Sequence, residues 1–391
     1  MVRMWRSGVL AFSMAVVALA LPTGAAMAQA TAVPVAASTT VDWKQAIAQR
    51  VEREMKAQGL VGLSLAIGRG EAVVHEASFG FEDREAKVAA SEKTMYRWAS
   101  VSKPVTAVAA MQLWREGKLD LDADVRVLVP EFPEKPQVVT VRQLLCHQGG
   151  IVHYSNGKVV VTKREYAEEH PFKSVISALD TFKESPLVNE PGAAYSYTTH
   201  GYILVSAAVE RAAKRPFAEY VKERIATPLG MESFRPDYQW EVIPHRAKGY
   251  RKGEKNAMVP STDTDVSWKL GGGGFISTAG DMARFGIGML GEKVVDRETK
   301  ALMWTPQALK DGKTTNYGLG FNVATTPDGL RVSHSGSQEK ARTQLLILPG
   351  KKAEEGKPAT EGFVVAIMCN TESAELMPLA VDVARIVQEQ K

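Results

Sequence analysis

The stretch Tyr96-Arg97-Trp98-Ala99-Ser100-Val101-Ser102-Lys103 leads straight into an apolar segment, 105–114. Because that segment is apolar on most sides, we expect a buried helix over 100–119. A helix places Ser100 and Lys103 one turn apart on the same face, and burial shelters the lysine enough for it to lose its proton. The Ser100 hydroxyl would lie at the positive end of the helix dipole, where a developing anion is stabilised. This pattern favours a serine nucleophile with a lysine beside it, although a helix-capping serine with an exposed lysine fits the same residues.

The same Ser-x-x-Lys pattern occurs twice more, in contexts that lack an apolar helix. Ser155 to Lys158 is a polar turn sequence, and Ser337 to Lys340 is a charged link between two strand-like runs. We expect neither pair to be catalytic. The Gly-x-Ser-x-Gly elbow, the His-Glu-x-x-His zinc helix and the P-loop do not occur in the sequence. The glycine run 271–274 lacks the spacing of a dinucleotide fingerprint and predicts a backbone that approaches another element closely.

Two further groups of residues could take part in chemistry. Tyr197-Thr198-Thr199 precedes an apolar run, 201–209, and so places a phenol and a hydroxyl at the mouth of a helix. His334-Ser335-Gly336 ends a strand-like run and is followed by Ser337. Taken alone, each group has an ordinary interpretation, since a tyrosine before a helix is usually packed and a histidine at a strand end is usually solvated or hydrogen-bonded.

Hydrophobic periodicity predicts an α+β protein whose two chain ends contribute to one lobe. Residues 40–95 contain a helix and two strands, and residues 315–391 contain three strands and a final helix, whereas 100–310 is helical and rich in loops. An α/β lobe made from both ends would enclose the helical lobe. The expected elements are helices over 41–55, 100–119, 141–145, 174–182, 202–213, 216–225 and 373–390, and strands over 61–67, 71–79, 330–334, 341–348 and 362–369.

The N-terminal segment has the layout of a secretory signal. Two arginines precede an uncharged apolar run, 8–21, which is followed by Pro22 and the small-residue sequence Ala26-Met27-Ala28. The run is shorter than the roughly 20 apolar residues that span a bilayer. We expect residues 1–28 to be cleaved and 29–39 to be a tether, so that 40–391 forms a single catalytic domain in the periplasm with no stable membrane span.

Composition excludes several classes of function. The chain is 45% hydrophobic and 24% charged, with a net charge of +4, so disorder and binding to nucleic acid are not favoured. None of the seven histidines pairs with another at ligand spacing on one element, and we expect neither a metal nor another cofactor. Cys146 and Cys369 could form one disulfide or remain two buried thiols. Cys146 beside His147 could also be a nucleophile, but a buried structural cysteine is the favoured interpretation.

Taken in order, these elements resemble the serine β-lactamase and penicillin-binding protein superfamily. The resemblance is to the branch of class C β-lactamases, D-Ala-D-Ala carboxypeptidases and related esterases and peptidases, and it covers nearly the whole chain after the signal. The matching segments are Tyr96 to Lys103 (the nucleophile segment), Leu144 to Gly150 (Leu-Leu-x-His-Thr-Ser-Gly in the family), Pro191 to Tyr202 (the tyrosine loop), Thr227 to Met231, Gly273 to Phe285, Tyr317 to Phe321 and His334 to Gly336 (usually Lys-Thr-Gly).

The resemblance implies a fold and a mechanism. The fold would be an antiparallel sheet flanked by helices, with a mostly helical lobe. Ser100 would attack a carbonyl and form an acyl-enzyme, Lys103 would help to deprotonate it, and Tyr197 would act as general acid and base. A neighbouring ammonium would have to lower the pKa of the phenol for that role. The backbone N–H groups of Ser100 and Ser337 would form the oxyanion hole.

Two departures from the family pattern bear on the substrate. Thr199 stands where most relatives have asparagine, and His334 stands where lysine is usual, which places efficient turnover of β-lactams in doubt. We therefore expect an exported serine hydrolase that prefers peptide-like amides to esters and β-lactams, with Thr199, His334, Ser335, Gly336 and Ser337 lining the substrate site. The alternative is a sensor that binds penicillin or peptidoglycan fragments without turnover. The oligomeric state and the individual substrate are open.

Overall fold

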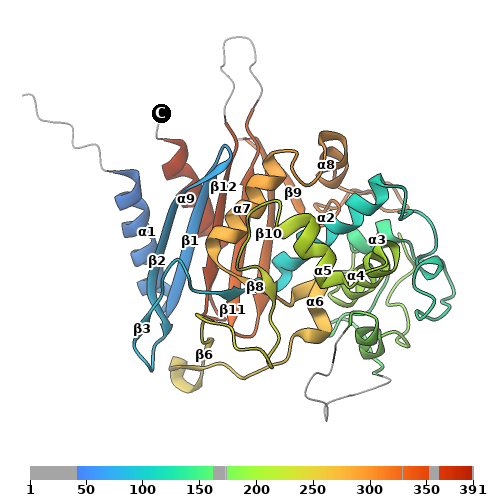
Figure 1. Ribbon diagram of the computed structural model, residues 1–391, viewed down its shortest axis with the longest axis horizontal. Helices are drawn as coiled ribbons and strands as arrows, with labels where there is room; N and C mark the ends of the chain where they lie inside the picture. The colour runs from blue at the N-terminus through green and yellow to red at the C-terminus, as the bar shows by residue number, and fades with distance from the viewer. Residues whose placement is uncertain (1–41, 162–171, 173, 328, 352–360, 390–391) are drawn as a thin grey trace, which may run out of the picture. The chain divides into compact units, whose positions relative to one another are not determined.

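The central sheet of the protein is built from both ends of the chain, as the computed structural model shows (Figure 1). The structure describes residues 42–161, 172, 174–327, 329–351 and 361–389. Its helices are α1 (Trp43–Gln58), α2 (Ser102–Arg115), α3 (Val141–Leu145), α4 (His200–Ala213), α5 (Phe217–Val221), α6 (Leu270–Gly273), α7 (Ala279–Leu290), α8 (Arg297–Met303) and α9 (Met377–Gln388). Its strands are β1 (Gly62–Arg69), β2 (Ala72–Asp83), β3 (Val88–Ala89), β4 (Tyr96–Arg97), β5 (Arg235–Pro236), β6 (Tyr250–Lys252), β7 (Met258–Pro260), β8 (Phe275–Ser277), β9 (Asn322–Thr326), β10 (Gly329–Gln338), β11 (Ala341–Leu348) and β12 (Phe363–Cys369).

Seven strands form one antiparallel sheet in the order β3-β2-β1-β12-β11-β10-β9. The two ends of the chain meet where β1 pairs with β12, with Leu63 opposite Cys369. Both strands are almost wholly buried, which explains their nearly continuous apolar sequences. The sheet and its surrounding helices confirm the α+β class that the sequence predicts.

Helices cover both faces of this sheet. α1 and α9 pack together on one face, where Ile47 and Val51 of α1 join Leu379 and Val383 of α9 in a single apolar cluster with β1 and β12. α7 packs on the opposite face against β1, β11 and β12. Burial of these apolar stripes is the main contribution to the stability of such layers.

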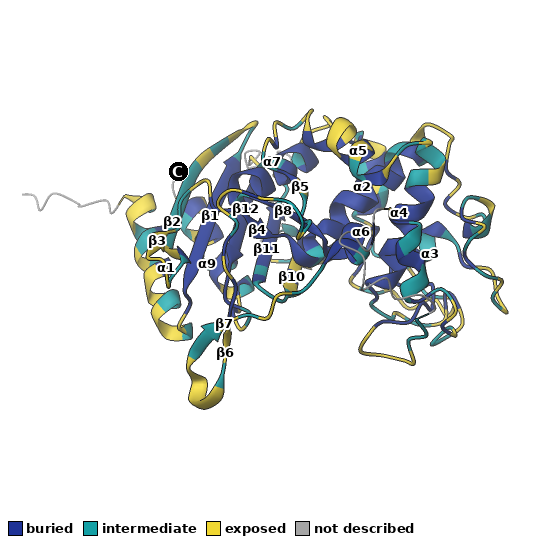
Figure 2. Cartoon of the chain, turned by 60° about the horizontal axis from the view of Figure 1, so that its bottom comes forward, coloured by how far each residue is buried: buried dark blue, intermediate teal, exposed yellow. Residues whose placement is uncertain are grey.

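α2 runs through the interior of the helical part of the protein. Residues Ser102 to Met111 are all buried, and Figure 2 shows this helix in dark blue beside α4 and α6. A helix that is apolar all round is stable only when neighbours enclose it, and the alanines of α2 allow α4 and α6 to approach. The prediction of a buried helix here is confirmed, but the helix begins at Ser102, because Ala99–Val101 forms a separate short 3₁₀ turn.

The glycine run 271–274 supports the close approach that its sequence predicts. A Cβ atom on Gly271 would lie 2.7 Å from Cβ of Ser206, and one on Gly272 would lie 2.7 Å from Cγ2 of Thr199. These distances are shorter than any side chain tolerates without movement of its neighbours. The run therefore lets α6 lie directly against α4.

Several other expectations need correction. β10 continues through Gly336 to Gln338 and does not stop at His334. Residues 174–182 hold only a 3₁₀ segment, Ser177–Thr181, and the helix expected over 216–225 is α5 followed by a π-helical turn. α1 is capped by Asp42, whereas the expected cap Thr40, the signal 1–28 and the tether 29–39 lie outside the described residues. Within the described part of the chain, no helix is long and apolar enough to cross a bilayer.

Candidate active site

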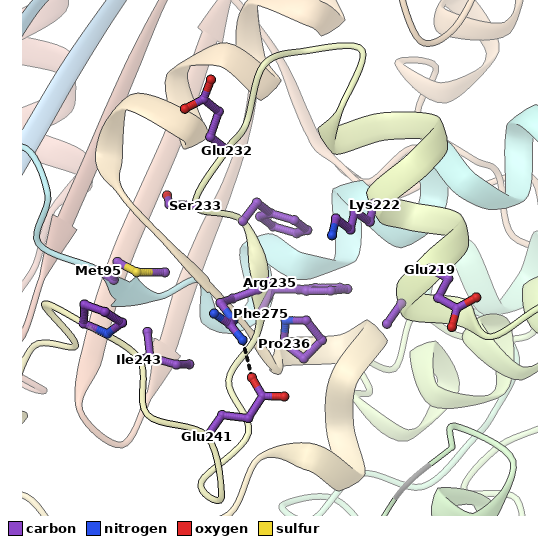
Figure 3. A pocket seen from close by; sticks show the side chains of 13 residues that line it. Met95, Glu219, Lys222, Glu232, Ser233, Arg235, Pro236, Glu241, Ile243 and Phe275 are labelled. Carbon is purple, nitrogen blue, oxygen red and sulfur yellow. Dashed lines mark hydrogen bonds and ion pairs between the residues drawn. The ribbon is translucent and has the colours of Figure 1, made fainter.

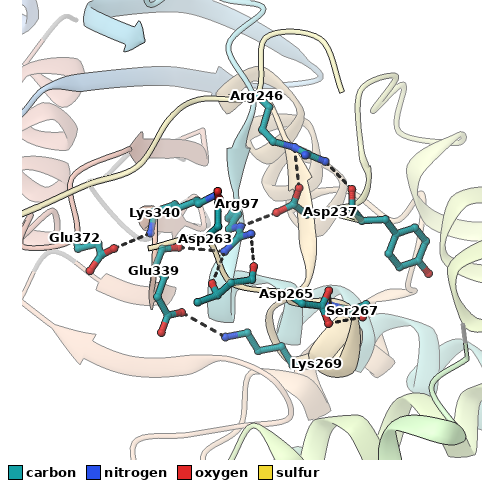
Figure 4. Close-up of polar contacts among 12 residues, drawn as sticks. Arg97, Asp237, Arg246, Asp263, Asp265, Ser267, Lys269, Glu339, Lys340 and Glu372 are labelled. Carbon is teal, nitrogen blue, oxygen red and sulfur yellow. Dashed lines mark hydrogen bonds and ion pairs between the residues drawn. The ribbon is translucent and has the colours of Figure 1, made fainter. Parts of the chain in front are cut away.

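A rigid scaffold holds the segment that leads to Ser100. Arg97 of β4 is buried, and its guanidinium donates to Asp237 Oδ2 at 2.5 Å and to the Thr264 carbonyl at 2.9 Å (Figure 4). The indole of Trp98 is fully buried and donates to Ser277 Oγ of β8 at 2.7 Å. These buried, hydrogen-bonded groups fix the backbone on the N-terminal side of the nucleophile.

Ser100 follows a strained residue. Ala99 has φ +48°, a left-handed conformation that costs an alanine on the order of 1 kcal/mol. Strain of this kind persists only where the surroundings enforce it, as the anchored Trp98 does here. Ser100 lies in the short 3₁₀ turn that precedes α2 and remains partly exposed, so its hydroxyl can reach a substrate while its backbone is held.

Lys103 is fully buried and has three polar neighbours. Its Nζ lies 2.9 Å from Ser100 Oγ, 3.3 Å from Thr199 Oγ1 and 2.7 Å from the Gly272 carbonyl oxygen. Burial lowers the pKa of Lys103 well below its usual range, and the charge of Lys269 lowers it further. The pair that the sequence places one turn apart is thus in hydrogen-bond contact, and burial disfavours the charged form of the lysine.

Tyr197 lies against this lysine through its ring. Lys103 Nζ is 4.9 Å from the centroid of the Tyr197 ring. Burial raises the pKa of the Tyr197 phenol, and a hydrogen bond with Ser100 opposes that rise. The expected lowering of this pKa by an ammonium is not found, because the effect of burial on the phenol is the largest one. Burial therefore favours the neutral form of the Tyr197 phenol.

Two histidines that the sequence analysis did not select hold the tyrosine loop. Nδ1 of His147 accepts a hydrogen bond from the Thr198 backbone N–H at 3.2 Å, and Nδ1 of His153 accepts one from the Thr199 N–H at 3.1 Å. The His147 ring also packs against the Tyr197 ring in a tilted arrangement, with 4.3 Å between ring centroids. Burial lowers the pKa of both histidines, for His153 to about 4, so both rings stay neutral and keep an acceptor nitrogen.

His334 is buried inside the site and is not a solvated residue at a strand end. Its Nε2 lies 2.8 Å from the Tyr317 hydroxyl and its Nδ1 lies 2.8 Å from the Ser335 carbonyl oxygen. Burial lowers the pKa of His334 to about 3. The side chain of Ser335 in turn donates to Gln344 Oε1 at 2.8 Å. His334 is therefore a neutral residue whose two ring nitrogens are both occupied.

β10 and β11 press directly on the nucleophile segment. A Cβ atom on Gly336 would lie 2.6 Å from the Trp98 carbonyl oxygen and 2.9 Å from Cβ of Ala99, so only glycine fits. Thr343 of β11 donates to the same Trp98 carbonyl at 2.8 Å. The next residue, Ser337, is exposed, and beyond Ser333 β9 no longer pairs with β10. An open stretch of strand thus runs beside Ser100.

The two cysteines and the lysines of the other two Ser-x-x-Lys patterns have surroundings that differ from those of Lys103. Cys146 and Cys369 are both buried and free, so they form no disulfide. Burial raises the pKa of the Cys146 thiol to about 12, which makes it a poor nucleophile. Lys158 is exposed, and Lys340 pairs with Asp263. Among the described residues, no group of three His, Cys, Asp or Glu side chains could hold a metal ion.

Comparison with known proteins agrees with this geometry. The family profile described as Beta-lactamase matches residues 47–388. The chain belongs to the beta-lactamase family. It is therefore a serine beta-lactamase-like hydrolase, and the resemblance drawn from its motifs is confirmed.

Individual relatives within the beta-lactamase family extend over most of the chain. The human serine beta-lactamase-like protein LACTB, mitochondrial, is 31% identical in an alignment of 427 positions. This alignment covers 86% of this chain and 77% of that protein. The putative penicillin-binding protein PbpX of Bacillus subtilis is 26% identical, with 71% of this chain and 65% of PbpX covered. The octameric penicillin-binding protein homologue from Pyrococcus abyssi superimposes with a TM-score of 0.70 at 22% identity, covering 88% of this chain and 77% of that one. This last likeness confirms the predicted β-lactamase/transpeptidase-like fold.

Proposed function

We propose that this protein hydrolyses an amide or ester through an acyl-enzyme on Ser100, with Lys103 as the base. The observation that carries the proposal is the 2.9 Å contact between Ser100 Oγ and the buried Lys103 Nζ. A neutral amine has two N–H donors and one lone pair. The Gly272 carbonyl and the Thr199 hydroxyl can accept the two donors, which leaves the lone pair for the Ser100 O–H.

Acylation follows from this arrangement. The Ser100 proton passes to Lys103 Nζ as Oγ forms a bond to the substrate carbonyl carbon, and the carbonyl oxygen gains the negative charge. The N–H groups of Ser100 and Ser337 stabilise that oxyanion. Collapse of the intermediate breaks the bond to the leaving group, which takes a proton from the neutral Tyr197 phenol, and Lys103 returns a proton to Tyr197.

Deacylation repeats these steps with water. A water molecule gives a proton to the amine of Lys103 and attacks the acyl carbonyl, and Ser100 leaves with a proton supplied through Tyr197. The products are a free acid and the regenerated enzyme. Peptide-like amides are the favoured substrates, esters come next, and β-lactams follow, since Thr199 and a neutral His334 replace the usual asparagine and lysine. Export by the signal 1–28, before catalysis by 40–391, is part of this proposal.

The test is the intact mass of the protein after exposure to a fluorophosphonate and, separately, to a penicillin. We expect the wild type to gain one fluorophosphonate adduct and Ser100→Ala to gain none. Ser155→Ala removes the serine of another Ser-x-x-Lys pattern and should label like the wild type. A lasting penicillin adduct would favour the sensor alternative, and destruction of the drug would indicate a β-lactamase. Labelling of Ser100→Ala at the wild-type level would refute the assignment of the nucleophile.

A further inference from the structure

Tyr317 is a buried residue that contacts two parts of the active site at once. It lies between α8 and β9 and is 2% exposed. Its hydroxyl is 2.8 Å from Nε2 of His334 in β10, and its ring centroid is 4.8 Å from that of His147. His147 in turn accepts a hydrogen bond from the tyrosine loop. One side chain thus joins the strand that carries Ser337 to the support of the loop that carries Tyr197.

The partners of His334 determine which groups donate. The Ser335 carbonyl oxygen can only accept, so Nδ1 of His334, which lies 2.8 Å away, carries the proton. Nε2 then has a free lone pair and accepts a hydrogen bond from the Tyr317 O–H. The hydrogen bonds therefore run in one direction, from the Tyr317 hydroxyl through the imidazole to the Ser335 carbonyl.

The Ser335 carbonyl lies on an edge of β10 that has no strand partner. The His334 carbonyl faces β11, where Gln344 Nε2 donates to it at 3.3 Å. Backbone groups of successive residues in a strand point to opposite edges, so the Ser335 carbonyl and the Ser337 N–H both face the other edge. β9 pairs with β10 only as far as Ser333, and no other described strand covers this edge.

His334 takes the place of the missing strand at this edge. Its Nδ1–H binds the Ser335 carbonyl two residues before the N–H that we assign to the oxyanion hole. The imidazole is itself held by the buried Tyr317 hydroxyl. The position of the end of β10 thus depends on a side chain that lies outside the sheet.

We propose that Tyr317 is a positioning residue for the reaction, and that it acts through His334 to set the position of the Ser337 N–H. This inference rests on the proposed function. A backbone N–H stabilises the transition state only when it lies within hydrogen-bond distance of the place where the oxyanion forms. Looser anchoring of this strand end therefore reduces the rate of the chemical step more than it reduces the affinity for the substrate.

Two variants and their combination test the proposal in the full chain. Tyr317→Phe removes one hydroxyl and keeps the ring that packs against His147. His334→Asn keeps an amide N–H near the position of Nδ1 for the Ser335 carbonyl, but it offers no acceptor at the position of Nε2. If Tyr317 acts through His334, the double variant should lose no more activity than the weaker of the two single variants.

Tyr220→Phe is the matched control. Tyr220 of α5 is 4% exposed, and its hydroxyl donates to Gln112 Oε1 at 3.2 Å. The preceding α5 residues Ala218 and Glu219 line a surface cavity of about 380 Å³ that contains none of the active-site residues (Figure 3). This variant therefore measures the effect of losing a buried tyrosine hydroxyl outside the site.

The measurements are kcat and KM on p-nitrophenyl butyrate, the inhibition constant of phenylboronic acid, and the thermal midpoint. In the boronate adduct, Ser100 Oγ adds to boron, its proton passes to Lys103, and no group leaves. The adduct is tetrahedral and carries an oxygen where the oxyanion would form, so its affinity reports the oxyanion hole directly.

We expect Tyr317→Phe to lower kcat by about tenfold to a hundredfold relative to Tyr220→Phe, with KM changed by less than about threefold. The inhibition constant of phenylboronic acid should rise by a similar factor. The thermal midpoints of the two variants should fall by similar amounts, since each loses one buried hydrogen bond.

A kcat of Tyr317→Phe equal to that of Tyr220→Phe would overturn the inference. Additive losses in the double variant would overturn it as well, because Tyr317 would then act independently of His334. If Tyr317→Phe does not fold, His334→Asn is compared with Tyr220→Phe by the same criteria, and an unchanged kcat again overturns the inference. In each of these cases, Ser100-dependent hydrolysis by the wild type still supports the proposed function. If the wild type hydrolyses no ester and Ser100 takes no fluorophosphonate, the proposed function fails, and the inference fails with it.

Discussion

Lys103 Nζ contacts three polar groups that come from different parts of the sequence. Ser100 is one turn away, whereas Thr199 lies directly before α4 and Gly272 lies in α6. Thr199 stands where the resemblance implies asparagine, and its hydroxyl lies 3.3 Å from Lys103 Nζ. Threonine lacks the amide that could bind a substrate, so we expect Thr199 to orient the Lys103 amine.

Thr199→Val tests that role, because valine keeps the shape of threonine and removes the hydroxyl. We expect kcat on a neutral ester to fall by about tenfold, since a buried N–H that loses its acceptor costs about 1–3 kcal/mol. Thr199→Ser should restore most of the rate. The measurement is steady-state kinetics together with the thermal midpoint of each variant. A wild-type kcat in Thr199→Val would show that Lys103 needs no such acceptor.

Sequence reasoning located Ser100 and Lys103 because helical spacing is a local property. It could not place Gly272 against Lys103, since that contact depends on how α6 packs, although the glycine run did predict a close approach. The pKa of Tyr197 is raised and not lowered, for a related reason. Burial, which one sequence does not show, decides the pKa of a phenol more than its distance from a lysine.

At the level of elements, the segment 147–153 acts as a support for the tyrosine loop. Two consecutive backbone N–H groups, those of Thr198 and Thr199, each donate to a histidine of this segment. His147 reaches its position through a left-handed turn, with φ +59°. The sequence contains these histidines but does not show the turn, so it does not predict their contacts with the tyrosine loop. The predicted strand 330–334 is likewise shorter than β10, because Ser335-Gly336-Ser337 has the composition of a turn. Only the packing of Gly336 on Trp98 shows that these residues continue the strand.

Replacement of His153 by leucine should reduce activity by misplacing Tyr197. We expect kcat to fall by about tenfold to a hundredfold with little change in KM, because small errors of position affect the transition state most. His153→Asn offers an amide oxygen near the position of Nδ1 and should recover much of the rate. The two variants are compared by steady-state kinetics. If leucine and asparagine behave alike, the hydrogen bond to the Thr199 N–H has no part in positioning the loop.

Across the whole molecule, burial of neutral histidines should make the fold sensitive to acid. The pKa values of His153 and His200 are lowered to about 4 and that of His334 to about 3, in each case chiefly by burial. An unfolded histidine titrates near 6.5. Between these values the histidines are protonated in the unfolded chain but remain neutral in the folded chain. The free energy of unfolding therefore decreases as the pH falls from about 6.5 to about 4. Carboxyl groups whose pKa is raised by burial act in the opposite direction, and these are Glu76, Glu210 and Asp281.

Each such histidine changes the free energy of unfolding by at most about 1.4 kcal/mol per pH unit in this window. This is more than most single surface ion pairs contribute to stability. The prediction is a thermal midpoint that declines steadily below pH 6.5. His200→Asn removes one of these groups, whose ring stacks on Phe182 at 4.8 Å. The variant should be less stable at neutral pH but should show a shallower dependence of the midpoint on pH, because the unfolded chain then has one proton fewer to gain. Parallel curves for the wild type and His200→Asn would mean that His200 does not contribute to the response to acid.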